Sequence, residues 1–116
     1  MNRLFFSGRA ASDPDINTHG STTVTRLRMI SNEYAGKDGD GQRKERQVSI
    51  PFSAFGKQAE TIAKTVSTGD QLVIEANIRN NNYTDGEGKE RYEYNFEIVT
   101  FEYGAKGKGK GGDDSR

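Results

Sequence analysis

One stretch of helical periodicity interrupts a chain whose apolar residues otherwise alternate with polar ones. Between residues 57 and 68, four apolar residues fall on one face of an amphipathic helix at spacing i, i+3, i+4, i+7: Ala59, Ile62, Ala63 and Val66. Gly69 follows as a helix stop. The patterned segments on either side have the two-residue period of half-buried β-strands. The sequence therefore predicts a strand-dominated domain with one packed helix.

Five segments carry the strand pattern. Three precede the helix, at residues 4–7, 22–34 and 47–55, and two follow it, at residues 72–79 and 92–103. Residues 13–21 and 36–41 are predicted as loops because they are rich in turn-forming residues. In the last segment the apolar parity flips at Ile98-Val99, which predicts a β-bulge. Three strands, a helix and two strands form the element order of an all-β OB-fold, a five-stranded Greek-key barrel with its helix between strands 3 and 4.

The 116 residues suffice for one domain, which we place at residues 1–103. Residues 104–116 are a Gly/Lys-rich segment predicted to be a disordered tail. The formal net charge of the whole chain is zero. The first 103 residues carry 13 basic and 15 acidic side chains, so a polyanionic partner has to bind a local basic stripe.

Several classes of function are disfavoured by composition. The chain has no cysteine and one histidine, His19, so neither a metal centre nor a Ser-His-Asp triad is expected, and no cofactor is predicted. No nucleophile, base and orienting group can be recognised together, so we expect no enzymatic activity. Because no apolar run approaches the ~20 residues of a membrane span and no signal peptide is recognisable, we expect a cytoplasmic protein without membrane association.

The aromatic residues divide into two groups. Most lie on alternating apolar faces and are predicted to be core, among them Tyr92, Tyr94 and the phenylalanines Phe5, Phe52, Phe96 and Phe101. Three lie elsewhere: Phe55 has the polar parity of its strand, Tyr34 ends a strand beside a charged loop, and Tyr83 stands in a polar run. Four cations accompany them: Arg26, Arg28, Lys57 and Arg79. Exposed rings that can stack on unpaired bases, with cations for phosphates, predict single-stranded nucleic-acid binding.

Four motifs in order resemble those of the bacterial single-stranded DNA-binding proteins, in particular the short members carried by phages or plasmids. They are Gly8-Arg9-Ala10-Ala11-Ser12-Asp13-Pro14-Asp15, Phe55-Gly56-Lys57-Gln58-Ala59-Glu60, Thr68-Gly69-Asp70-Gln71-Leu72-Val73-Ile74-Glu75, and Tyr83-Thr84-Asp85 with Gly88 and Arg91-Tyr92. The second matches the family's most recognisable string almost letter for letter. The resemblance covers about residues 2–103.

This resemblance implies an OB-fold that binds single-stranded DNA with little regard to sequence, in DNA replication, recombination and repair. It places the family's base-stacking aromatics at Tyr34, Phe55 and Tyr83, and it places Ser49, which has no ring, at a fourth stacking position. It also implies a homotetramer, or a dimer, and replication or recombination proteins as partners. The family's acidic tail with a terminal phenylalanine has no counterpart in Asp113-Asp114-Ser115-Arg116.

Two alternatives share the predicted fold. A replication accessory protein resembling primosomal replication protein N has a start similar to Asn2-Arg3-Leu4-Phe5-Phe6-Ser7-Gly8, but it lacks the string found here at residues 55–60. An OB-type protein–protein adaptor is the alternative from another functional class. An adaptor would not need Phe55 and Tyr83 exposed on one basic track.

Overall fold

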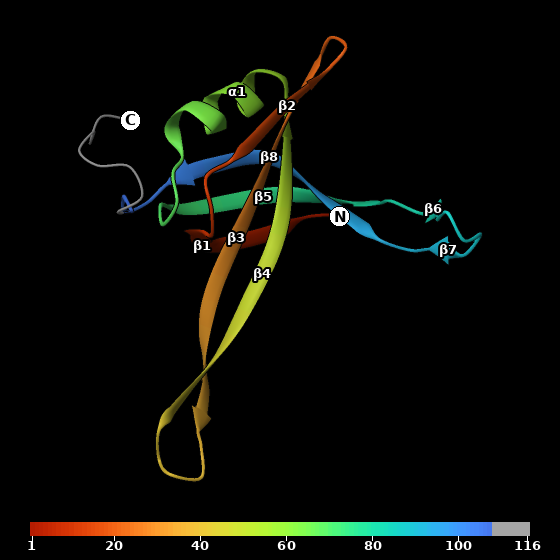
Figure 1. Cartoon of the computed structure of the whole chain (residues 1–116). Coiled ribbons are helices and arrows are strands. Elements are labelled where there is room, and N and C mark those ends of the chain that lie inside the picture. The colour runs from red at the N-terminus through yellow and green to blue at the C-terminus, as the bar shows by residue number, and fades with distance from the viewer. Residues whose placement is uncertain (108–116) are drawn as a thin grey trace.

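Five long strands close into a barrel, and a helix packs on one end of it (Figure 1). The computed structural model describes residues 1–107. The helix, α1, spans Gly56–Thr65, and within residues 1–107 no helix is long and apolar enough to cross a membrane. The strands are β1 Leu4–Ala10, β2 Asp15–His19, β3 Thr22–Lys37, β4 Arg43–Phe55, β5 Gln71–Asn80, β6 Tyr83–Thr84, β7 Glu90–Arg91 and β8 Tyr94–Tyr103.

The barrel strands are ordered β1-β5-β8-β4-β3, and β1 closes the ring by pairing with β3. The closing contact has only two residue pairs, Arg9 with Ile30 and Ala10 with Met29. β4 and β8 run parallel, whereas the other barrel pairs are antiparallel. Because α1 connects the third barrel strand to the fourth, the structure confirms the predicted OB-fold.

The core occupies the barrel interior and the seam beneath α1. Alternation along β3, β4 and β5 directs every second side chain inward, and these residues are buried: Leu27, Met29, Phe52, Ala54, Leu72, Ile74 and Ala76. The helix adds Ala59 and Ile62, and the buried Thr25 hydroxyl donates a hydrogen bond of 2.7 Å to the Ala59 carbonyl. The Phe52 ring lies between those of Phe6 and Phe96, at centroid distances of 5.8 and 6.2 Å.

The predicted bulge lies in β8 at Val99. Glu75 of β5 pairs with Thr100, but the next residue, Ala76, pairs with Ile98. Val99 is therefore the extra residue. Because of it, the inward-facing residues Ile98 and Phe101 are three positions apart instead of two. The parity flip in the sequence is the signature of this bulge, and the prediction is confirmed.

An additional strand, β2, forms where the sequence predicted a loop. Residues 15–19 pair along their whole length with the start of β3, through a two-residue turn at Gly20-Ser21. Gly20 has a φ of 62°, the left-handed conformation that such tight hairpin turns require. β2 is an edge strand with every residue exposed, so it lacks the apolar alternation on which the prediction depended.

Three aromatic residues predicted to be core are exposed instead. Phe5 alternates with the inward-facing Leu4 and Phe6, and its ring is 67% exposed on the outside of β1. Tyr92 and Tyr94 follow the alternation of β8, but they precede the part of the strand that enters the barrel, and both are exposed. Phe52 is buried as predicted, and Phe96 and Phe101 pack partly buried against the core.

The first residues of the predicted tail pair with β5. The Gly104 amide donates to the Gln71 carbonyl and the Gln71 amide to the Ala105 carbonyl, both at 2.8 Å. The Gly107 amide donates to the buried Asp70 carboxylate at 2.6 Å. Residues 104–107 therefore belong to the ordered body, although composition alone placed them in the tail. The rest of that tail, residues 108–116, lies outside the described residues.

Candidate nucleic-acid interface

The outer face of β3 and β4 carries three of the predicted site residues. Residues directly opposite in antiparallel strands point to the same side of a sheet. Arg26 is opposite Ser53, and two residues away Val24 is opposite Phe55. Because the alternate residues of β3 are buried, Arg26 and Arg28 point outward. The structure thus brings Arg26, Arg28 and Phe55 together on one outer face.

Phe55 is held where a strand changes directly into a helix. It is the last residue of β4, and Gly56 follows with a φ of 64°, a conformation that lets the chain turn at once into α1. The Phe55 ring is 44% exposed, and Lys57 is exposed in the first turn of the helix. The helix is fixed by its buried face, so the position of the Phe55 backbone is fixed as well.

Two hairpin arms extend from the barrel, one made by β3 and β4 and the other by β5 to β8 (Figure 1). Tyr34 lies on the first arm, and its ring is 55% exposed. The Arg43 guanidinium carbon is 4.7 Å from the centroid of this ring, a cation–π contact, and Arg43 Nε is 3.3 Å from Glu45 Oε1. Sequence reasoning missed Arg43, although the basic run at residues 43–46 was a signal for it.

Tyr83 lies on the second arm, in the β6–β7 hairpin. Its ring is 45% exposed, and its hydroxyl donates a hydrogen bond of 3.1 Å to Glu93. This bond, together with the negative charge of Glu93, raises the pKa of the Tyr83 hydroxyl above its usual value. The hydrogen bond anchors the tip of a side chain whose ring remains accessible to a base.

The turn of the same hairpin is organised by Asp85. Its carboxylate accepts hydrogen bonds from the backbone amides of Lys89 and Glu87 and forms an ion pair with Arg91 at 2.9 Å. The bond from the Lys89 amide, then the one from Arg91, lowers the pKa of Asp85 below its usual value. The turn that carries Tyr83 is therefore held by interactions of the ionised carboxylate.

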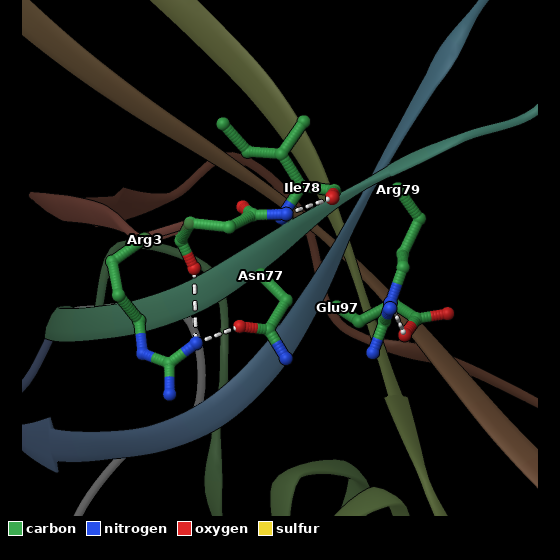
Figure 2. Close-up of polar contacts among 6 residues, drawn as sticks. Arg3, Asn77, Ile78, Arg79 and Glu97 are labelled. Carbon is green, nitrogen blue, oxygen red and sulfur yellow. Dashed lines mark hydrogen bonds and ion pairs between the residues drawn. The ribbon is translucent and has the colours of Figure 1, made fainter.

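The predicted cation Arg79 differs from the others in being paired. It lies on the outer side of β5 and forms an ion pair with Glu97 on β8 (Figure 2). The distance from Arg79 Nε to Glu97 Oε1 is 3.2 Å. Within residues 1–107, Arg26, Arg28 and Lys57 form no ion pair. Sequence reasoning missed Glu97, because its alignment with Arg79 is set by how β8 pairs with β5.

The seven predicted site residues form one group and three separate positions. Arg26, Arg28, Phe55 and Lys57 gather where β3 and β4 meet α1, whereas Arg79 lies across the sheet on β5 and Tyr34 and Tyr83 lie on the two arms. In the described part of the chain the rings of Tyr34, Phe55 and Tyr83 make no contact with one another. Over residues 1–107 the acidic and histidine side chains form no cluster of three that could hold a metal ion.

Solved structures of single-stranded DNA-binding proteins share this fold. A deletion mutant of the protein from Thermus aquaticus superposes with a TM-score of 0.74 at 19% identity, over 90% of this chain and 51% of that one. The small single-stranded DNA-binding protein of Streptomyces coelicolor superposes with a TM-score of 0.67 at 14% identity, over 88% of this chain and 93% of that one.

Sequence comparison leads to the same group of proteins. The chain is 33% identical over 93 residues to the single-stranded DNA-binding protein of Xylella fastidiosa, covering 79% of this chain and 56% of that protein. It is 31% identical over 111 residues to the one of Clostridium perfringens, covering 94% of this chain and 69% of that protein. The chain thus spans between about half and seven tenths of the length of these two relatives. The single-strand binding protein family matches residues 1–103, and the chain belongs to this family.

Proposed function

We propose that this chain binds single-stranded DNA with little sequence preference, by stacking bases on exposed rings and holding phosphates with basic side chains. The observation that carries the proposal is the exposed Phe55 ring on the same outer face as two arginines that lack acidic partners within residues 1–107, Arg26 and Arg28. Family membership and the names of the relatives support it.

The tolerance for sequence follows from the kind of contact. An aromatic ring offers its face to any base, and a guanidinium or ammonium group binds a phosphate that is the same at every nucleotide. Duplex DNA buries the faces of its bases, so Phe55, Tyr34 and Tyr83 would have no face to stack on. We therefore propose discrimination between single and double strands, with no reaction catalysed.

A titration with oligo-dT, duplex DNA and RNA of equal length, at two salt concentrations, tests this function. We expect oligo-dT to bind more tightly than duplex and to quench tyrosine fluorescence. Three of the predicted site cations, Arg26, Arg28 and Lys57, form no ion pair within residues 1–107. If each neutralises one phosphate, a slope of about 2 is expected in log K against log salt, at ~0.7 for each phosphate neutralised. Equal affinity for the duplex would refute the proposal. Absence of any nucleic-acid binding would favour the adaptor alternative.

We further propose that the protein works as a homotetramer, or as a dimer, in DNA replication, recombination and repair in the bacterial cytoplasm, with replication or recombination proteins as partners. The outer side of β1, β5 and β8 supports self-association. There Phe5 and Val73 are 67% and 44% exposed, beside a hollow of about 230 Å³. Sedimentation measures the assembly, and Phe5→Glu is expected to lower its mass. An unchanged mass would exclude this surface as the interface.

A further inference from the structure

We propose that Glu97 confines the phosphates of a bound strand to the β3–β4 half of the outer face, by repelling them from β8 and by holding Arg79 in an ion pair. The inference rests on the proposed function and adds to it the path of the strand across the face. Glu97 would act as a positioning residue, an acidic side chain that excludes the phosphates and leaves its part of the surface to uncharged bases.

The first argument is the register of the strands. One row of directly opposite residues crosses the outer face from β2 to β5: Asp15, Arg26, Ser53, Glu97 and Asn77. Neighbouring strands lie about 4.8 Å apart, so β8 is only about 10 Å from β3. The row therefore has one cation, Arg26 on β3, between two carboxylates, those of Asp15 on β2 and Glu97 on β8.

The second argument is that the arginines on the two halves are paired unequally. On the β5 side, Arg79 is bound to Glu97 at 3.2 Å, and Arg3 is bound to Glu75 at 2.8 Å. Arg3 is also hydrogen-bonded to Asn77 (Figure 2). On the β3 side, neither Arg26 nor Arg28 has an ion-pair partner within residues 1–107. Of these four arginines, the two without an acidic partner in the described part of the chain therefore lie on β3, where Arg28 donates a hydrogen bond of 2.8 Å to the neutral Ser49 hydroxyl.

The third argument is the accessibility of the carboxylate. The side chains of Arg79 and Glu97 are 58% and 32% exposed, so a strand lying on the face would meet the ion pair directly. Because Glu97 neutralises Arg79, a phosphate over this pair gains no net attraction, whereas a free arginine about 4 Å away would favour it about fivefold even in water. Over β3 the same phosphate is attracted by Arg26 and Arg28. The phosphates are therefore expected over β3 and β4.

The substitution Glu97→Gln tests the proposal, with oligo-dT affinity measured over a range of salt concentrations. We expect about fivefold tighter binding at low salt. We also expect the salt slope to steepen by about 0.7, because Arg79 becomes free to neutralise one more phosphate. In the double variant Glu97→Gln with Arg79→Gln, the added slope should disappear while the parent slope remains.

Glu102→Gln is the matched control. It removes the same charge from the same strand, five residues further along and opposite Val73, outside the row. Because Glu102 lines the hollow of the proposed self-association surface, the assembly of this variant has to be measured as well. Its salt slope should equal that of the parent, and sedimentation checks that the parent's assembly is kept. If Glu97→Gln binds no more tightly and leaves the slope unchanged, the inference is overturned. A parent protein that does not prefer single strands would instead refute the proposed function, so the two failures are distinguishable.

Discussion

Replacing Phe55 by alanine separates a binding role from a structural one. The ring is 44% exposed at the end of β4, so only about half of its surface contributes to folding. Burying a whole phenylalanine stabilises a fold by about 1.5–3 kcal/mol, and the expected loss of stability is therefore about 1 kcal/mol. A base stacked on the ring contributes ~1–3 kcal/mol, so binding should weaken about fivefold to a hundredfold.

Both quantities are measured on the same preparation. Fluorescence anisotropy of labelled oligo-dT gives the affinity, and a thermal melt gives the stability. Phe96→Ala is the control, because its ring packs 6.2 Å from that of Phe52 and against the core. It should lower stability by about 3 kcal/mol and leave the affinity of the folded fraction intact. The reasoning is refuted if Phe55→Ala unfolds the protein, or if it binds oligo-dT as tightly as the parent.

Three further predictions concern the hairpin of Tyr83 and the closure of the barrel. The raised pKa of Tyr83 means that its hydrogen bond to Glu93 is fully present below pH 10 and is lost as the pH rises through the folded-state pKa. In an ultraviolet titration, Glu93→Gln should make Tyr83 ionise at a lower pH than in the parent. The pKa of Asp85 is lowered, chiefly by the Lys89 amide, so its contribution should persist above pH 4 and disappear as the pH falls through the folded-state pKa, which NMR of the hairpin amides can follow. An added methyl group at Gly8 would overlap a β3 carbonyl oxygen, so Gly8→Ala should lower stability by about 1–3 kcal/mol in a denaturant melt.

The fold was predictable from the sequence wherever one face of an element is buried. The alternation from Val48 to Ala54 and the helical spacing from Ala59 to Val66 both reflect burial, and both elements are present. The parity flip at Val99 even located the bulge. β2 was missed because all of its side chains are exposed. Neither face has to be apolar, so the sequence shows no alternation of apolar and polar residues there.

The candidate site was predictable in its residue types and only partly in its arrangement. Parity alone directs Phe55 outward, and the structure agrees. Parity also directed Phe5 inward, because alternation identifies two faces of a short strand without deciding which one packs. The pairing of Arg79 with Glu97 depends on the register of β5 and β8, which no local sequence pattern reports.

The narrow seam between β1 and β3 also sets an order for folding. β1 has its long partner in β5, where Phe6 pairs with Ile74, whereas β3 and β4 are joined by a local hairpin. Local contacts form first, because closing a long loop costs more chain entropy. During synthesis most of the first strand, apart from its two pairs with β3, therefore remains unpaired until β5 has been made. The β3–β4 hairpin can be complete by then. The surface that carries Arg26 and Arg28 can therefore form before the barrel closes.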